Sequence, residues 1–421
     1  MNNTKQTFVF GFAIFAAFFG AGNLVLPPLL GFNSGPDWWL VSLGFITSAT
    51  IIPLFALFAH ARLQGTMLDF GNKVSPFFSL VYCFCVYLIA VALPCPRTAA
   101  VTHEMAIAPF FGTTSILTSS IYFILVFLFV MNRGKVLDLL GKYLTPLIVI
   151  ILLAIIVIGI FTRPSEIEPS IYNTPFLSGF FEGYQTYDAI AGMLTGGIVI
   201  ISLNMQGYTS LKEKKSIIAR SSFIAMAGLF VIYIGLMFIG AHFNGQFDST
   251  ISRPELLSGL ALKTLGNFGN ISLSILVALA CFTTAVAIIV GTADFFKGLF
   301  NESRIVYTVT AIISCVLGIL VGQMNVKYII DVALPALMFI YPLTIVLIFL
   351  NVIPEKYASQ KVFRGVVLVT FIFSIPDFLG YLLEANWLNQ LKDVIPLAND
   401  NLGWVLPSLV VFVILNLLKN K

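Results

Sequence analysis

The sequence predicts an all-α membrane protein with many spans, and three observations lead to this fold class. Hydrophobic residues make up 58% of the 421 residues, charged residues only 10%, and the mean hydropathy is +0.97. About a quarter of the residues of a soluble globular chain are charged, so a surface this poor in charge cannot face water all round. Apolar runs of about 18 residues or more, long enough to cross a bilayer, recur along the whole chain.

Twelve such runs are expected to form membrane-spanning helices, and they occupy nearly all of a single transmembrane domain over residues 1–421. Their expected cores are 8–31, 38–59, 76–97, 115–131, 136–161, 176–203, 219–243, 270–296, 305–322, 328–351, 363–382 and 403–418. The first run is too long for the core of a signal peptide and lacks a cleavage site, so we expect it to remain as the first span.

Lysine and arginine are distributed unevenly over the connecting segments, and this bias sets the expected orientation. With the N-terminus inside the cell, seventeen of the 23 Lys and Arg residues fall on inner segments. The six on outer segments are Arg97, Arg163, Arg253, Lys263, Lys327 and Lys392. We therefore expect both termini to be cytoplasmic. The net charge of +4 belongs to these loops, so the composition does not call for a nucleic-acid partner.

The first expected span contains helix breakers near its middle. The segment 19–23 reads FGAGN and is followed by Pro27 and Pro28 within one apolar run. Glycine weakens a helix and proline removes a backbone donor, so an unwound stretch is predicted. In lipid, free backbone groups persist only where they line a cavity or bind a ligand, and a helix N-terminus favours an anion. The alternative interpretation is close helix packing through small residues.

The sixth expected span repeats this pattern. The segment 179–188, GFFEGYQTYD, places the carboxylates of Glu182 and Asp188 inside an apolar run. Acidic groups in a membrane span are costly and indicate a functional site by default. In the alternative interpretation this segment is an outer loop and both acids are solvated. Only 15 residues, 189–203, follow as an apolar run, which is short for a full span and favours a broken span that starts near Pro175.

Breaks in the first and sixth spans suggest two five-span halves of inverted topology, residues 8–161 and 176–351. An odd number of spans in each half makes the second half run in the opposite direction. Two peripheral helices over 363–418 would follow. In transporters built this way the substrate site lies between the two breaks.

The eighth expected span carries two adjacent hydroxyl groups, those of Thr283 and Thr284, in the middle of an apolar helix. Together with carbonyl groups of an unwound neighbour, these oxygens would make a small dry site for Na⁺. Alternatively, each hydroxyl donates a hydrogen bond to the carbonyl three or four residues earlier in its own helix.

Taken together, these motifs resemble the bacterial branched-chain amino acid:cation symporter family, and the resemblance covers essentially the whole chain. It rests on Phe18-Phe19-Gly20-Ala21-Gly22-Asn23-Leu24 with Pro27-Pro28, on Glu182-Gly183-Tyr184 with Thr186 and Asp188-Ala189, and on Thr283-Thr284-Ala285-Val286. That family is similar to the amino acid–polyamine–cation superfamily with the leucine-transporter fold. The resemblance implies sodium-driven import of leucine, isoleucine and valine across the cytoplasmic membrane.

The resemblance also implies a set of site residues. Those expected to bind the substrate are Gly20, Ala21, Gly22 and Asn23, whose backbone amides receive its carboxylate, together with Glu182, Gly183, Tyr184 and Thr186. The expected Na⁺ site combines the carbonyls of Ala16, Phe19 and Ala280 with the hydroxyls of Thr283 and Thr284, and Asn23 is a candidate ligand of a second Na⁺. The sixth-span motif departs from the leucine-transporter pattern, which leaves the roles of Glu182 and Asp188 open.

No organic cofactor is expected. The expected partners are the amino acid substrate and the lipid bilayer, and the oligomeric state stays open. In the expected cycle, Na⁺ holds the first and eighth spans together while spans 1, 2, 6 and 7 rock against the rest.

Two alternatives are kept beside this interpretation. A proton-coupled or uncoupled carrier of the same fold, for other neutral amino acids, would use Lys142 on the fifth span in place of Na⁺. The other role open to Lys142 is snorkelling to the cytoplasmic interface. A channel or an intramembrane enzyme is the second alternative. The sequence contains no H-E-x-x-H, no G-x-S-x-G and no phosphate loop, so an enzyme is not expected.

Overall fold

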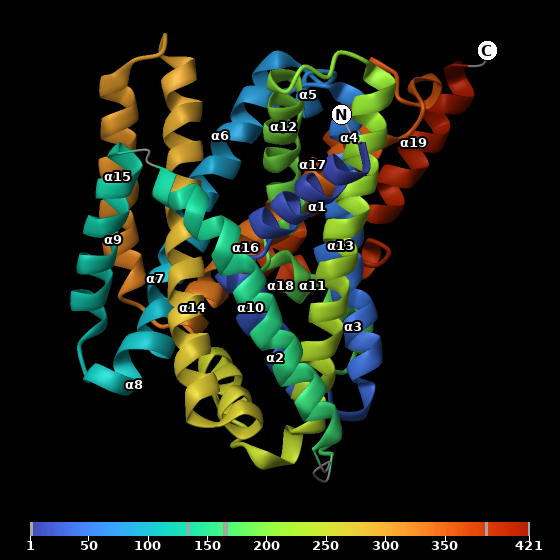
Figure 1. Cartoon of the computed structure of the whole chain (residues 1–421). Coiled ribbons are helices and arrows are strands. Elements are labelled where there is room, and N and C mark those ends of the chain that lie inside the picture. Colours follow the sequence, from blue (N-terminus) through green and yellow to red (C-terminus); the bar gives the residue numbers. More distant parts are fainter. Residues whose placement is uncertain (1–2, 133–134, 163–166, 384–385, 420–421) are drawn as a thin grey trace.

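The computed structural model describes residues 3–132, 135–162, 167–383 and 386–419, and within these ranges it consists of helices joined by loops (Figure 1). The α-helices are α1 (Asn3–Phe18), α2 (Ala21–Ser34), α3 (Trp38–Ile46), α4 (Ile52–Leu63), α5 (Leu68–Gly71), α6 (Pro76–Ala92), α7 (Pro94–Thr102), α8 (Ala108–Phe111), α9 (Ser115–Met131), α10 (Lys135–Phe161), α11 (Pro175–Tyr184), α12 (Asp188–Met205), α13 (Leu211–His242), α14 (Arg253–Leu299), α15 (Arg304–Gly322), α16 (Val326–Val352), α17 (Gln360–Gly380), α18 (Asn386–Val394) and α19 (Val405–Lys419). Two π-helical turns, Thr47–Ile51 and His103–Ile107, and four 3₁₀ turns, Gly35–Asp37, Asn244–Gln246, Glu355–Tyr357 and Ala398–Asp400, complete the described elements.

The helices confirm the predicted fold class. Among the described residues, nine helical stretches are long and apolar enough to cross a membrane, and the shorter apolar stretches are Gln6–Phe18, Ser115–Met131 and Val405–Leu418. Each of the twelve predicted cores overlaps one of these stretches. Because one stretch, Gly22–Leu63, runs through parts of two predicted spans, the count of twelve crossings stays a prediction.

Several helix boundaries differ from the predicted ones for local reasons. The third span kinks at Leu93 and continues as α7, because Pro94 and Pro96 restart the helix there. The eighth predicted span lies inside the longer α14, whose first part is separated at Gly266 by a positive φ of 69°. This first part is an additional short helix that the sequence pattern did not predict.

The predicted break in the first span is present and is narrower than expected. Only Phe19 and Gly20 lie outside the helices, and Gly20 takes an extended conformation with ψ 176°. The predicted unwound stretch is therefore confined to these two residues, because Ala21 already begins α2. Pro27 and Pro28 lie inside α2 without ending it. Membrane helices tolerate proline where neighbouring groups satisfy the freed carbonyls.

The sixth span is also broken, at three residues between α11 and α12. Tyr187 has φ 62° and ψ 13°, a left-handed conformation that is unusual for a tyrosine. A non-glycine residue in this conformation is typical of a strained functional segment. The helix before the break begins at Pro175, as the sequence predicted.

The elements that carry the breaks pack into one group. Helix α13 packs against α1, α2 and α4, while α11 packs against α3 and α12 against α4. Helix α14 packs against α2, α7, α9, α10 and α15 on the other side of the first break.

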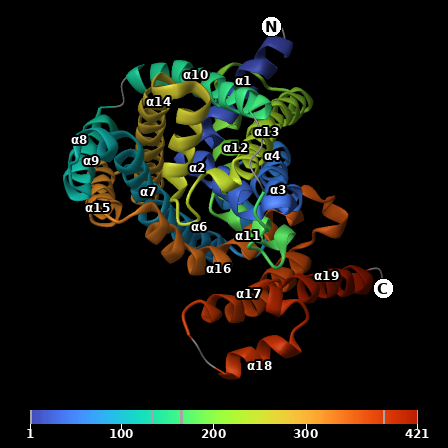
Figure 2. The same cartoon turned by 90° about the horizontal axis from the view of Figure 1, so that it is seen from below.

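Figure 2 shows α17, α18 and α19 at the edge of the molecule. Figure 1 shows both chain ends toward the same end of the bundle. The boundaries of the two predicted halves stay a prediction.

Two glycines allow α2 and α13 to touch backbone to backbone. A Cβ atom on Gly31 would lie 1.8 Å from the Met237 carbonyl oxygen, and one on Gly240 would lie 2.0 Å from the Pro28 carbonyl oxygen. Small residues drive helix contact in membranes, because lipid supplies no hydrophobic force between helices. The pair therefore fixes α2 against α13, next to the first break.

We expect Gly31→Ala to lower the thermal unfolding temperature of the purified protein, because the new methyl group forces α2 away from α13. Overpacking of this kind costs about 1–3 kcal/mol. Gly291→Ala is the matched control, since no heavy atom lies within 4 Å of a Cβ at that helical position. Equal unfolding temperatures for the two variants would contradict the close contact.

Candidate functional site

The two helix breaks meet through a buried amide and a buried carboxylate. The Asn23 Nδ2 atom lies 2.9 Å from Asp188 Oδ1 and 3.0 Å from Asp188 Oδ2. The Tyr233 hydroxyl on α13 donates to Asp188 Oδ2 at 3.0 Å. The Asn23 side chain is 3% exposed and that of Asp188 is 1% exposed. A carboxylate this deeply buried needs such donors, since an unpaired buried charge is very costly.

Local structure explains why these two residues stand at the breaks. Asn23 lies in the first turn of α2, and its amide also donates to the Phe18 carbonyl at 2.8 Å, at the open end of α1. Asp188 is the first residue of α12, where the helix dipole favours a negative charge. The Thr186 hydroxyl donates to the Gly183 carbonyl at 2.8 Å and accepts from the Asp188 N–H at 3.2 Å, which ties the break together.

Sequence analysis missed Arg97, which it assigned to an outer segment. The structure places Arg97 on α7 with a side chain only 4% exposed, so that assignment is wrong. Its Nη1 donates to the Gln185 carbonyl at 2.9 Å, and its guanidinium lies 5.5 Å from the centre of the Tyr187 ring. A Cβ atom on Gly22 would lie 2.1 Å from Arg97 Nη2, so the guanidinium lies directly against α2. A single arginine in an apolar run was the signal that could have found it.

The predicted sixth-span residues divide between the break and the helix before it. Thr186 lies in the break, whereas Glu182, Gly183 and Tyr184 belong to α11. Both carboxylate oxygens of Glu182 accept hydrogen bonds from Arg253, each at 3.0 Å. The Tyr184 ring stacks on Tyr341 with centroids 4.1 Å apart. Glu182 is therefore engaged in an ion pair in this structure, and its contact with substrate stays a prediction.

Helix α14 packs against α2 and brings Thr284, one of the predicted Na⁺ ligands, to the first break. The Gly20 N–H donates to the Phe18 carbonyl instead of the Ala16 carbonyl four residues earlier. Likewise, the Asn23 N–H donates to the Gly20 carbonyl instead of the Phe19 carbonyl. A Cβ atom on Gly20 would lie 3.4 Å from Thr284 Oγ1, so this hydroxyl faces the break.

The other threonine of the motif follows the alternative interpretation. The Thr283 hydroxyl donates to the carbonyl of Ala280 at 3.0 Å, within its own helix. The Na⁺ site as a whole stays a prediction. The side chain of Lys142, the alternative coupling group, lies outside the described residues.

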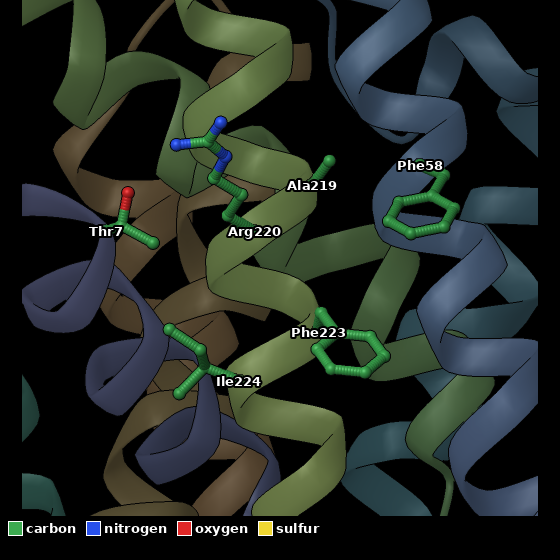
Figure 3. A pocket seen from close by; sticks show the side chains of 6 residues that line it. All are labelled: Thr7, Phe58, Ala219, Arg220, Phe223 and Ile224. Atoms are coloured by element: carbon green, nitrogen blue, oxygen red, sulfur yellow. The ribbon is translucent and has the colours of Figure 1, made fainter. Parts of the chain in front are cut away.

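A pocket of about 500 Å³ lies away from both breaks, between α1, α4 and α13 (Figure 3). Its lining residues are Thr7, Phe58, Ala219, Arg220, Phe223 and Ile224. Phe223 is 65% exposed, so the pocket opens on the outer surface of the bundle. No residue of the two breaks lines it, and we do not assign it to the substrate.

The arrangement of helices defines the class of protein. The chain is similar to Mhp1 in its inward-facing conformation, with 14% sequence identity, a TM-score of 0.63, and coverage of 97% of this chain and 89% of that one. It is also similar to MhsT solved in complex with L-phenylalanine, with 15% identity, a TM-score of 0.57 and 97% of each chain covered. Both neighbours have the leucine-transporter fold, so this chain has that transporter fold.

Sequence comparison then shows the family. Residues 3–421 match the family model described as branched-chain amino acid transport protein. The chain is 31% identical over 414 residues to the branched-chain amino acid transport system 2 carrier protein of Pseudomonas aeruginosa, covering 96% of this chain and 94% of that protein. The chain therefore belongs to the branched-chain amino acid transport protein family and is a multi-pass membrane transporter rather than an enzyme.

We expect the two acids of the sixth span to respond differently to neutralisation. Asp188→Asn leaves the buried Asn23 amide and Tyr233 hydroxyl without their anion, and should lower amino acid uptake in proteoliposomes about 100-fold or more. Glu182→Gln breaks a partly exposed ion pair, and should lower uptake less than about fivefold. Each variant is the control for the other, and a larger loss for Glu182→Gln would reverse the assignment.

Proposed function

We propose that this protein imports leucine, isoleucine and valine together with Na⁺ across the bacterial cytoplasmic membrane. The family to which the chain belongs supports the substrate class. Coupling to Na⁺ is supported by one observation above the others: the Ala16 and Phe19 carbonyls lack their usual helical donors where Thr284 Oγ1 faces the break. Unwound backbone carbonyls are the groups that hold coupling ions in transporters of this kind.

The proposed Na⁺ site joins α1 to α14. Its ligands are the carbonyls of Ala16, Phe19 and Ala280 and the hydroxyls of Thr283 and Thr284. A hydroxyl has one proton and two oxygen lone pairs. The Thr283 hydroxyl could therefore coordinate the ion through a lone pair while its proton stays bonded to the Ala280 carbonyl, or after the hydroxyl rotates away from that carbonyl. Asn23 is proposed as a ligand of a second Na⁺.

The proposed substrate site lies between the two breaks. Gly20, Ala21, Gly22 and Asn23 line the first break, and Thr186 belongs to the second. Glu182, Gly183 and Tyr184 lie in the helix turn before it, where the Glu182 carboxylate is held by its ion pair with Arg253 and the Glu182 side chain is a minor part of the proposed site. In an apolar pocket, one methylene more or less in the substrate side chain changes the binding free energy by only about 1–3 kcal/mol. One site can therefore serve all three branched side chains.

The proposed cycle is alternating access. Helices α1–α4 and α11–α13 pack together and would rock as a unit against α14 and its neighbours, with both termini in the cytoplasm. Na⁺ strengthens the contact between α1 and α14, and substrate strengthens the contact between the breaks. Each ligand then raises the affinity for the other by the same factor.

Uptake of radiolabelled leucine into proteoliposomes tests this function. We expect concentrative uptake with an inward Na⁺ gradient, and competition by isoleucine and valine but not by lysine or glutamate. A pH gradient without Na⁺ should give no accumulation. Accumulation driven by the pH gradient alone would contradict Na⁺ coupling and support the proton-coupled alternative.

The ion site itself is tested by threonine substitutions on α14. Thr284→Ala and Thr283→Ala should each raise the Na⁺ concentration for half-maximal uptake, about tenfold or more, because each loses an oxygen ligand. Thr292→Ala is the control, since its hydroxyl donates to the Ile288 carbonyl at 2.8 Å on the same helix, away from the break. Unchanged Na⁺ dependence in both test variants would remove this site from the proposal.

A further inference from the structure

Arg97 has more hydrogen-bond donors than the described residues use. A guanidinium carries five N–H donors, and it stays charged at any physiological pH. Among the described residues, the only hydrogen bond from this side chain is that from Nη1 to the Gln185 carbonyl, and none of the ion pairs includes it. A buried charge is costly unless it is paired, and within the described ranges this buried cation forms no ion pair.

The free donors of Arg97 lie against the start of α2. Gly22 has no side chain, and the Arg97 Nη2 atom lies where a Cβ would otherwise be. The N-terminus of α2 has no side-chain cap at Gly20. The first backbone N–H groups of a helix lack intrahelical acceptors and favour an anion. Arg97 and this helix end therefore attract negative charge to the same place.

Other buried groups at the break also lack partners. The Gln185 Oε1 atom and the Tyr187 hydroxyl have no hydrogen-bond partner in the part of the chain that the structure describes, although Gln185 is 0% exposed and Tyr187 is 7% exposed. Unsatisfied buried polar atoms are rare in folded proteins, and each calls for an explanation. Both belong to the same three-residue break as the carbonyl that Arg97 contacts.

Asp188 supplies the opposite charge. Its carboxylate is buried at the start of α12, one residue after Tyr187, whose ring lies 5.5 Å from the Arg97 guanidinium. In the described part of the chain, no salt bridge joins Asp188 to Arg97. The site thus presents one cation and one anion that do not neutralise each other directly. A free α-amino acid carries the complementary pair of charges on neighbouring groups.

We propose that the Arg97 guanidinium binds the α-carboxylate of the transported amino acid and that the Asp188 carboxylate receives its α-ammonium group. This inference rests on the proposed function and names the side chains that select a free amino acid. A guanidinium binds a carboxylate through two parallel charge-assisted hydrogen bonds, which explains an arginine with free donors at this place. An arginine whose only role was to stabilise the break would need only its hydrogen bond to the Gln185 carbonyl.

Ligands that lack one of the two charges test the assignment. Thermal stabilisation of the purified transporter in Na⁺ is measured against rising concentrations of leucine, leucinamide, which lacks the carboxylate, and 4-methylpentanoate, which lacks the ammonium group. Arg97→Gln should weaken leucine and 4-methylpentanoate binding about 10- to 150-fold. It should change leucinamide binding less than about threefold, and Arg97→Lys should fall between wild type and Arg97→Gln.

Arg253→Gln is the matched control, because this arginine pairs with Glu182 on α11 instead of lying at the break. Its ratio of leucine to leucinamide affinity should equal that of the wild type. If Arg97→Gln weakens leucine and leucinamide equally, or changes neither, the assignment is overturned. If Arg97→Gln does not fold, the same ratio measured in Arg97→Lys decides in the same way.

These measurements distinguish a failure of this inference from a failure of the proposed function. Failure of the wild type to bind leucine, isoleucine and valine, with Arg97-dependent binding of another zwitterionic amino acid, would overturn the substrate class and support the charge pair. Leucine binding that does not depend on Na⁺ would overturn the coupling alone. Leucine binding with an unchanged ratio in the Arg97 variants would overturn the charge pair alone.

Discussion

The contact between the Asn23 amide and the Asp188 carboxylate holds the two helix breaks together, and the rest of the site depends on it. Backbone groups released in a membrane must find partners, since lipid offers none. The Asn23 amide satisfies the open Phe18 carbonyl and at the same time binds the acid of the other break. Each break is thus stabilised by the other, although the two residues are 165 positions apart in sequence.

Around this contact the site combines buried charges with released backbone groups. Arg97 provides a cation beside α2, and Asp188 provides an anion at the start of α12. The Ala16 and Phe19 carbonyls, which lack their usual helical donors, add partial negative charge at the first break. A zwitterion and a cation are the ligands that such an arrangement complements. The proposed substrate site and the proposed ion site therefore share one short break, the segment between α1 and α2.

Much of the fold and part of the site could be predicted from local sequence. Composition and apolar runs give the membrane class, and glycine near proline or acid marks where a span breaks. The extent of each break was less predictable: Ala21 already belongs to α2, because one extended residue, Gly20, is enough to interrupt the helix. The position of Thr284 against the break also followed from the motif.

The contacts between distant residues could not be predicted from local patterns. Charge counting assigned Arg97 to an outer segment. A lone arginine in an apolar run could have marked it as a candidate, but local sequence does not show that its side chain lies against Gly22. In the same way, the ion pair of Glu182 was not predicted, because its partner Arg253 lies 71 residues further along the chain. Both residues took part in long-range pairings, which single-sequence patterns do not encode.

The central claim is that the two breaks together form the substrate site. A cryo-electron microscopy structure of the purified transporter with leucine and Na⁺ tests this most directly. The account predicts density for the amino acid between the first turn of α2 and the first turn of α12, in contact with both breaks. Density in the pocket beside Arg220, or elsewhere with both breaks unchanged, would contradict it.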